Sequence, residues 1–228
     1  MATPVSDFIQ TLATTDLLET KFQDVGVIID DGTMTAAQTL NVNTLLNFIY
    51  KGLINLYSVL PIKISVYEDS YNAATTYDDL IVLPESCLNL QKITDLDLKE
   101  LPLDSPDYEY KLKNNLYKGI LFKTIAINKF MADGYFDGTV YDVLFHYYDS
   151  PSRITLKDTL AIPPSCEDAL LYYVAYRAYD TTKKVTQVGD TSVLYKQKFD
   201  LEIKRLKDIH DLYLFDFDPD RLGNKGFV

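Results

Sequence analysis

A single amphipathic segment, residues 35–60, most constrains how this chain can fold. Thr35 and Gln38 have the spacing of a capping box, in which a hydroxyl and an amide satisfy free N–H groups at a helix start. Pro61 follows, and the residue before a proline avoids helical geometry. The segment therefore predicts a helix over 35–60. Its apolar residues recur at spacings of three and four, at Val42, Leu45, Leu46, Ile49, Leu53, Leu56 and Leu60.

Three further segments have helical patterns. A short helix is predicted near the N-terminus, with Pro4 or Ser6 at its start, and a turn at Asp30-Asp31-Gly32 separates it from the long helix. Its inward residues are Phe8, Ile9 and Leu12. A third helix follows Pro163-Pro164, with Ser165 as N-cap and Asp168 in the first turn, and buries Ala169, Leu170, Val174, Ala175 and Ala178. The last helix spans about 190–212 after a polar connection over 181–189, with a stripe of Tyr195, Phe199, Ile203, Leu206, Ile209 and Tyr213.

The middle of the chain changes to a period of two, which is typical of strands. Ile62, Ile64 and Val66 alternate with polar residues, and 80–83 is a short apolar run. A hairpin is predicted from strands 119–128 and 139–148, with Asp133-Gly134 and Asp137-Gly138 as turn residues. Its expected faces are Leu121, Ile125 and Ile127 on one strand and Tyr141, Val143, Phe145 and Tyr147 on the other. Residues 95–113, acidic and containing Pro102 and Pro106, are expected to form a loop or an irregular edge.

These patterns predict an α+β fold. A helical bundle is expected from residues 1–62 and 163–212, with a small antiparallel β-rich insertion at 63–162. The chain has 228 residues, of which 47% are hydrophobic and 24% charged, so it can bury a core. Residues 213–228 contain Tyr213, Phe215, Phe217, Leu222 and Phe227 without a regular period. Such a segment either folds back on its own subunit or forms an extended C-terminal arm that orders on a neighbour, and we predict the arm.

The charge and the cysteine content exclude several classes of function. With 22 basic and 33 acidic side chains the net charge is −11, which is unsuited to wrapping nucleic acid. The two cysteines, Cys87 and Cys166, and two histidines do not suffice for a zinc site or a disulfide framework, so no metal or cofactor is expected.

The N-terminus lacks the pattern of a secretory signal, and no stretch suits a membrane span. We therefore expect a chain that stays in the cytoplasm where it is made.

Catalytic and metal-binding motifs are weak. Asp216, Asp218 and Asp220 alternate like the start of a calcium loop, but that loop also needs Gly at its sixth position and Glu at its twelfth. Asp107 and Glu109 are spaced as in part of a nuclease site, yet two acids this close in a loop do not reach one metal. His146 and His210 have no nucleophile near them in the sequence. The segments 83–87 and 162–166 share Pro, Ser and Cys in register. Two similarly built turns or helix starts would explain this, as would duplicated halves of the chain or a paired redox site.

The excess of aromatic residues points to an interface or to a tyrosine-rich core. The chain has 18 Tyr, 11 Phe and no Trp, and tyrosine buries its ring while its hydroxyl stays hydrated. Tyr172, Tyr176 and Tyr179 share one face of the third predicted helix, with Tyr173 adjacent. Both alternatives are open for this face: core packing, or a subunit interface in which Arg177 and Arg205 add ion pairs.

The layout resembles one known family. Two early helices with Leu45, Leu46 and Ile49, the Leu83-Pro84 turn, the strand ending Phe145-His146-Tyr147-Tyr148, and Ile162-Pro163 before an Ala- and Tyr-rich helix are similar to the head-to-tail connector, or adaptor, proteins of short-tailed bacteriophages. Tyr195, Lys198 and Phe199 continue the likeness, which covers 6–212. The use of Tyr, Asn, Ile and Lys is similar to that of AT-rich phages such as the crAss-like group. The long acidic middle and the low Gly and Ala content depart from the family.

The resemblance implies a structural virion protein without catalysis. Such proteins form a closed, usually twelvefold homo-oligomeric ring at the head-tail junction, bound to the portal on one side and to the next tail ring or tube protein on the other. Double-stranded DNA passes through without sequence-specific binding, and the virion assembles in the host cytoplasm. The alternatives are another tail-tube or gatekeeper ring, a hydrolase using carboxylates from the segment 95–109, and a carbohydrate-binding module with exposed tyrosines.

Overall fold

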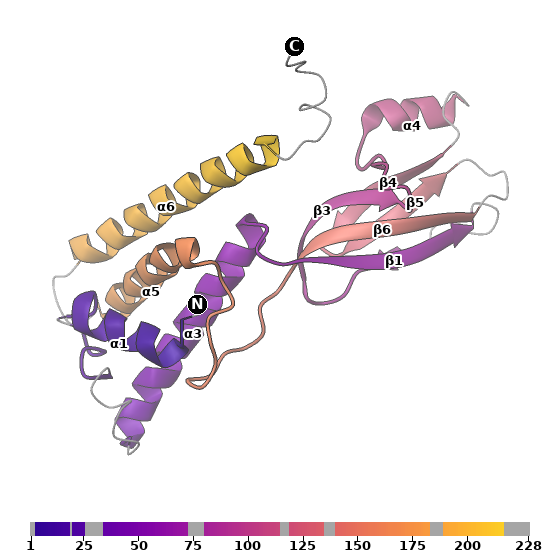
Figure 1. Cartoon of the computed structure of the whole chain (residues 1–228). Coiled ribbons are helices and arrows are strands. Elements are labelled where there is room, and N and C mark those ends of the chain that lie inside the picture. The colour runs from indigo at the N-terminus through magenta and orange to yellow at the C-terminus, as the bar shows by residue number, and fades with distance from the viewer. Residues whose placement is uncertain are drawn as a thin grey trace, which may run out of the picture. The chain divides into compact units, whose positions relative to one another are not determined.

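The computed structural model describes residues 3–18, 20–25, 34–72, 80–114, 119–134, 140–182 and 189–216 (Figure 1). The chain divides into two compact units. The helical unit comprises Met1–Leu60 and Pro151–Val228, and the sheet unit comprises Pro61–Ser150. Apart from one short helix at 106–113 in the sheet unit, helices and antiparallel strands are segregated along the chain, which is the α+β class that the sequence predicts.

The helical unit contains α1 (Val5–Thr15), α3 (Ala36–Val59), the short 3₁₀ helix η1 (Pro164–Cys166), α5 (Glu167–Thr182) and α6 (Gly189–Asp216). The predicted capping box of α3 is confirmed. The Thr35 N–H donates to Gln38 Oε1 at 2.8 Å, and the Gln38 N–H donates to Thr35 Oγ1 at 3.3 Å. Leu60 has extended geometry before Pro61 and ends the helix where the sequence places its end.

The predicted apolar stripes of α1, α3 and α5 supply much of the core of the helical unit, whereas in the predicted α6 stripe Leu206 is buried and Tyr195, Phe199, Ile203 and Ile209 are half-buried. The buried residues include Phe8, Ile9 and Leu12 of α1, Val42, Leu45, Ile49, Leu53 and Leu56 of α3, and Ala169, Leu170, Val174, Ala175 and Ala178 of α5. Gly52 lets α3 approach α5 closely. A Cβ added there would lie 2.6 Å from Leu170 Cδ1 and 2.9 Å from Tyr173 Cδ1. The predicted turn at Asp30–Gly32 lies outside the described residues.

Two predicted helix ends are wrong. Ser165 is not an N-cap, because it lies inside η1, whose cap is Pro163 without a side-chain hydrogen bond. The last helix continues to Asp216 rather than ending at 212, so Tyr213 and Phe215 belong to α6 and not to an extended arm. No proline lies between Pro164 and Asp216, so no residue of that type ends the helix at 212.

The segment that leads from the sheet unit back to the helices also belongs to a different unit than predicted. Residues 151–162, which we name the strap, group with the helical unit rather than with the insertion. Backbone hydrogen bonds explain this: Leu160 N–H donates to Thr3 O at 2.8 Å and Val5 N–H to Asp158 O at 3.0 Å. The Tyr57 hydroxyl of α3 also donates to Ala161 O.

The sheet unit consists of two three-stranded antiparallel sheets. In one sheet the order is β1 (Ile64–Asn72), β6 (Val140–Asp149) and β3 (Cys87–Asp95). In the other it is β2 (Leu80–Val82), β5 (Lys129–Gly134) and β4 (Ile120–Ala126).

The predicted hairpin of 119–128 with 139–148 is wrong. β4 pairs instead with β5 across the turn at Ile127-Asn128, and β6 lies in the other sheet between β1 and β3. A bulge between Thr124 and Ala126 breaks the alternation of β4. Leu121 is therefore buried whereas Ile125 and Ile127 are 55% and 71% exposed, and the expected common face does not form.

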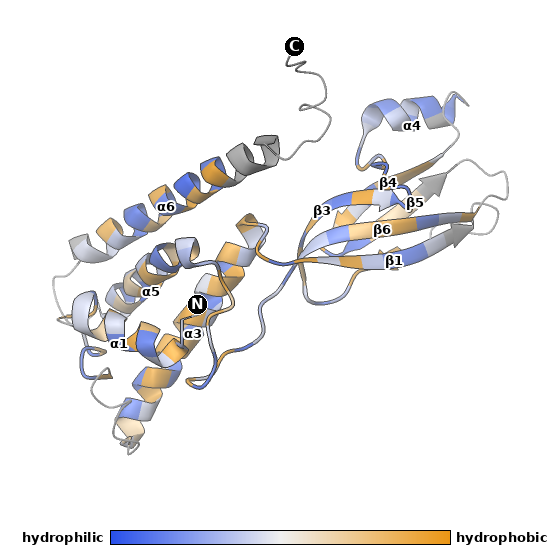
Figure 2. Cartoon of the chain, in the orientation of Figure 1, coloured by the Kyte–Doolittle hydropathy of each residue, from blue (hydrophilic) through white to orange (hydrophobic). Residues whose placement is uncertain are grey.

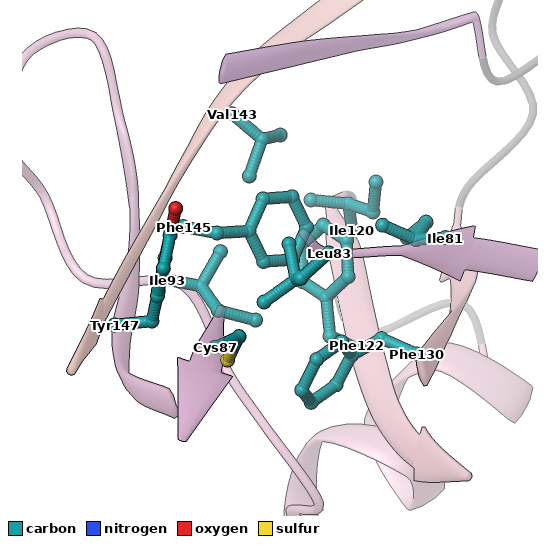
Figure 3. Close-up of a cluster of buried hydrophobic side chains, with 10 residues drawn as sticks. All are labelled: Ile81, Leu83, Cys87, Ile93, Ile120, Phe122, Phe130, Val143, Phe145 and Tyr147. Atoms are coloured by element: carbon teal, nitrogen blue, oxygen red, sulfur yellow. The ribbon is translucent and has the colours of Figure 1, made fainter. Parts of the chain in front are cut away.

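Aromatic side chains fill the space between the two sheets (Figure 3). Phe145 of β6 is fully buried, and its ring centroid lies 5.4 Å from that of Phe122 and 6.0 Å from that of Phe130. The predicted inward face of β6 is confirmed, since Val143, Phe145 and Tyr147 are buried. Alternating side chains of one strand thus hold both sheets together.

Residues 95–113 are more ordered than predicted. They include α4 (Pro106–Lys113), with Pro106 at its first position, acids in its first turn and lysines in its last turn. Asp104 has a φ of 48° and fixes the chain before α4, because its carboxylate accepts hydrogen bonds from the Thr124 N–H, at 2.8 Å, and the Thr124 hydroxyl. Lys123 of β4 contacts Glu109 of α4 at 3.3 Å, so this helix is tied to the sheet.

Asp149 joins the points where the chain enters and leaves the sheet unit. Its Oδ2 lies 2.5 Å from Lys63 Nζ and accepts a hydrogen bond from Ser65 Oγ at 3.0 Å. The Asp149 N–H donates to Lys63 O, and the Ser150 N–H donates to Ser86 O. Burial alone would raise the pKa of Asp149, but hydrogen bonds from Lys63, Ser86 and Ser65 outweigh it and lower the pKa.

Phe145→Ala should open a cavity between the sheets. The expected loss of stability is about 3–5 kcal/mol in the sheet unit. Hydrogen exchange read by mass spectrometry should show faster exchange in β3, β4 and β6 and unchanged protection in α3 and α5. Val66→Ala, at a position 53% exposed, is the control and should change little. Equal loss of protection in both units would show that they do not unfold separately.

Asp149→Asn should remove a pH-dependent part of the stability. Because the folded pKa of Asp149 is lowered, its contribution is present above its unfolded pKa of about 3.9 and is lost as pH falls through the lower folded value. Urea denaturation at pH 7 should show the variant less stable by about 1–3 kcal/mol. The difference between the two proteins should shrink as pH falls below about 4. A difference that stays constant down to pH 2 would contradict an ionised Asp149 in the fold.

Candidate functional site: the tyrosine face of α5 and α6

A cluster of tyrosine rings lies between α5 and α6, which pack side by side (Figure 1). Tyr195 of α6 stacks on Tyr179 of α5, with ring centroids 5.6 Å apart and an interplanar angle of 11°. The ring centroid of Tyr172 lies 6.3 Å from that of Tyr195. Lys198 Nζ lies 4.9 Å from the centroid of Tyr195 and 5.5 Å from that of Tyr172, a cation–π arrangement. Two of the predicted interface tyrosines therefore have partners within their own chain.

The hydroxyls of this cluster bind the N-terminal part of the helical unit. Tyr195 donates to Asp16 Oδ1 at 2.7 Å, and Tyr179 donates to Leu18 O at 2.8 Å. Burial, the hydrogen bond to Asp16 and its negative charge all raise the pKa of Tyr195. The phenol stays protonated over the physiological range, so the cluster fixes α1, α5 and α6 to one another rather than acting as an acid or base.

The remaining predicted interface residues lie in two different places. Tyr176 is half-buried, 6.2 Å from Tyr173, and Arg177 lies 5.7 Å from the Tyr176 ring and 5.9 Å from that of Phe48. Arg205 is exposed on α6, where its Nε donates to Glu202 Oε1 at 2.9 Å. The structure thus brings Arg177 to the tyrosines but directs Arg205 to a carboxylate of its own helix.

Sequence reasoning missed the role of α6 in this cluster. The apolar pattern predicts Tyr195 on a stripe of the last helix but does not pair it with the third helix. The tyrosine spacing leaves Tyr173 beside the shared face of Tyr172, Tyr176 and Tyr179. Tyr173 packs on Phe199 with a centroid distance of 5.3 Å. The aromatic spacing on α6, at positions 195 and 199, is the signal that could have paired the two helices.

The predicted arm is only partly described. Tyr213 and Phe215 lie in α6, and their side chains are not among those described. Phe217, Leu222 and Phe227 lie outside the described residues, as do Asp218 and Asp220 of the rejected calcium pattern. The role of these residues in binding a portal or a neighbour stays a prediction.

Three acids of the segment 95–109, namely Asp95, Asp104 and Glu109, have partners within the chain. Glu109 Oε1 lies 2.8 Å from Lys113 Nζ and 3.3 Å from Lys123 Nζ, and the hydrogen bond from Lys113 is the main cause of its lowered pKa. Asp95 accepts a hydrogen bond from the Lys99 N–H at 2.8 Å. Asp104 binds Thr124.

His146 is half-buried and both cysteines are buried, whereas the side chain of His210 is not among those described. His146 Nε2 lies 3.0 Å from Thr94 Oγ1, and burial, with a smaller effect of Lys92, lowers its pKa. Burial raises the pKa of Cys87 to about 11, and burial also raises the pKa of Cys166. Both cysteine N–H groups donate at 2.9 Å to the carbonyl of the proline three residues earlier, Pro84 or Pro163. The two similar segments therefore form similar turns in different units, and burial favours the protonated form of both thiols.

The described residues offer neither a metal-binding cluster nor a membrane-spanning helix. Among the described residues, no three His, Cys, Asp or Glu side chains gather closely enough to hold a metal ion. Within the same part of the chain, no helix is both long enough and apolar enough to cross a membrane.

Comparison with known proteins assigns no family. No family model and no curated protein matches the chain.

Tyr195→Phe tests whether the tyrosine face is structural. Losing the hydrogen bond to Asp16 should destabilise the helical unit by about 1–2 kcal/mol, while Tyr195→Ala, which also removes the stack on Tyr179, should cost about 2–4 kcal/mol. Urea denaturation followed by circular dichroism would measure both. Lys196→Ala, at an exposed position on the same helix, is the control. If both tyrosine variants matched this control, the tyrosines would be free to serve an interface instead.

Proposed function

We propose that this protein is a structural virion component, a homo-oligomeric ring that joins the portal to the tail of a short-tailed phage and lines the DNA passage. It acts by assembly rather than by catalysis. The element order that carries the resemblance supports the proposal: α1 and α3 precede the sheet unit, and α5 and α6 follow it.

The open edge of β1 is the observation that carries the proposal. This strand has nine residues and pairs with β6 on one side, and no described strand pairs with its other side. Ile64 and Val66 are 44% and 53% exposed on it. A long edge strand with exposed apolar side chains is a template for pairing with another chain, which monomeric proteins usually avoid.

A second surface lies on α6, in the other unit. Hydrophobic residues alternate with polar ones along this helix (Figure 2), and Val193, Leu194 and Leu201 are 50%, 49% and 70% exposed. Leu194 and Leu201 are seven positions apart and so share one stripe. Two different association surfaces per subunit are what a head-to-tail ring needs, whereas a two-fold dimer needs one.

The net charge of −11 suits a passage for DNA. Phosphates bind proteins mainly by displacing counterions with Lys and Arg. A strongly acidic ring would offer few such contacts, so DNA could slide through without being held.

The alternatives receive less support. Another tail-tube or gatekeeper ring would use the same surfaces and differs only in its neighbours. A carboxylate hydrolase would need free acids, but Asp104 and Glu109 are bound to Thr124 and to two lysines. A carbohydrate-binding module could use Tyr110, which is 65% exposed on α4, although sugar sites need a concave surface around such a ring.

Mixing two assembly variants would test the head-to-tail ring. Val66→Lys should block the β1 surface and Leu201→Lys the α6 surface, so each variant alone should stay monomeric under conditions where the natural chain forms rings. Because each variant keeps the surface that the other lacks, their mixture should form dimers and stop there. Native mass spectrometry and electron microscopy would count the subunits.

Ile127→Lys, at another exposed apolar position of the sheet unit, is the control and should leave rings intact. A natural chain that is only monomeric or a two-fold dimer at the head-tail junction would contradict the ring. An assembly that tolerates Leu201→Lys but not Val66→Lys would indicate a two-fold contact through β1.

A further inference from the structure

A groove of about 450 Å³ runs along the face of α3 that points away from α5 and α1. It is lined by α3 and by the strap, and its lining includes Asn47, Tyr50, Lys51, Ile54, Arg153 and Ile154. The α3 residues lie at helical spacing on one face, opposite the buried stripe of Leu45, Ile49 and Leu53. The volume is in the range of sites that bind ligands or short peptide segments.

The groove combines an apolar floor with positive charge at its rim. Ile54, Ile154 and Tyr50 are half-buried, whereas Lys51 and Arg153 are exposed. No carboxylate lines the groove, although the chain as a whole has a net charge of −11. Neither Lys51 nor Arg153 takes part in an ion pair between described residues. The chemistry of the groove therefore matches an acidic segment that carries an aromatic side chain.

The wall that carries Arg153 and Ile154 is held in place by the strap. Directly after Ile154, the Thr155 N–H and hydroxyl both donate to the Asp158 carboxylate, at 2.6 and 2.8 Å. Farther along, Tyr57 of α3 binds Ala161 O, and Leu160 binds Thr3 O. The wall is thus attached to α3 itself, so binding need not order it, which lowers the entropic cost of association.

The acidic aromatic sequence that fits this groove is in the chain itself. Phe217-Asp218-Pro219-Asp220 follows α6, with two carboxylates flanking a proline and a phenylalanine ahead of them. We propose that this segment of one copy binds the α3 groove of a neighbouring copy. Phe217 lies on the apolar floor, and Asp218 and Asp220 pair with Lys51 and Arg153. This inference rests on the proposed ring for the presence of a neighbour.

A site-specific cross-link in the full chain would test the contact. A photoreactive benzophenone amino acid replaces Phe217 in unlabelled copies, which are mixed with ¹⁵N-labelled natural copies and irradiated. Mass spectrometry should find cross-links from position 217 of unlabelled copies to residues 43–54 or 153–154 of labelled copies. Cross-links to other regions, or only within one copy, would overturn the proposal.

Charge reversal adds a control for folding. Lys51→Glu with Arg153→Glu in the labelled copies should lower the yield on the order of fivefold, because two surface ion pairs are replaced by repulsion. Lys157→Glu with Lys204→Glu, an equal change at exposed positions outside the groove lining, should leave the yield unchanged. Asp218→Lys with Asp220→Lys in the unlabelled copies should restore cross-linking to the reversed groove, which a misfolded groove could not do. An unchanged yield after groove reversal would also overturn the proposal.

The same samples separate this inference from the proposed function. Native mass spectrometry of the unirradiated mixture gives the number of subunits. Rings without cross-links in the groove would leave the proposed function standing and remove the groove contact. Cross-links in the groove of a two-fold dimer would support the groove contact and contradict the proposed ring.

Discussion

The fold depends on how Asp149 joins the two ends of the sheet unit. An insertion into a helical protein must bring its first and last residues together, or its strands pull the flanking helices apart. Here the carboxylate of Asp149, the last residue of β6, binds Lys63 just before β1, Ser65 within β1 and the side chain of Ser86 just before β3. One carboxylate thus holds the beginnings of two strands and the end of a third. The helical unit can then form its own core from segments separated by about ninety residues of sequence, as the boundaries at Leu60 and Pro151 show.

Sequence patterns predicted the helices better than the strands, for a physical reason. A helix such as α3 bonds within itself, so the capping box at Thr35, the stripe through Ile49 and the stop at Pro61 are all local signals. A strand such as β6 is completed by partners far away in the sequence. The turn residues Asp133-Gly134 suggested a hairpin with the preceding strand, but the pairing is decided by where Phe145 can be buried, between β1 and β3 and against Phe122. The choice of partner strands depends on packing throughout the sheet unit, so no short-range sequence pattern reports it.

The tyrosine face shows the same limit at the candidate site. The spacing of Tyr172, Tyr176 and Tyr179 correctly places them along one helix, but spacing does not say whether their partner is another helix of the chain or another subunit. Tyr195 gives two of them a partner within the chain, because its ring stacks on Tyr179 and its centroid lies 6.3 Å from that of Tyr172. The groove beside α3 could not have been foreseen at all, since one of its walls comes from the strap, about a hundred residues later in the sequence. No local sequence pattern connects Lys51 with Arg153.

The charge on β1 bears on which assembly its open edge can form. Glu68 is the central residue of the strand, which spans Ile64–Asn72. If two copies paired their β1 strands antiparallel and in register, Glu68 would face Glu68 and Asp69 would lie beside them, and like charges directly opposite destabilise a strand pair. The open edge of β1 can thus bind another chain through its backbone groups and through the side chains of Ile64 and Val66. Two copies of β1 are nevertheless unfavourable partners for each other. This combination works against a two-fold dimer and favours a contact with a different surface of the next copy, and contacts of that kind close into rings when the rotation between neighbours allows it.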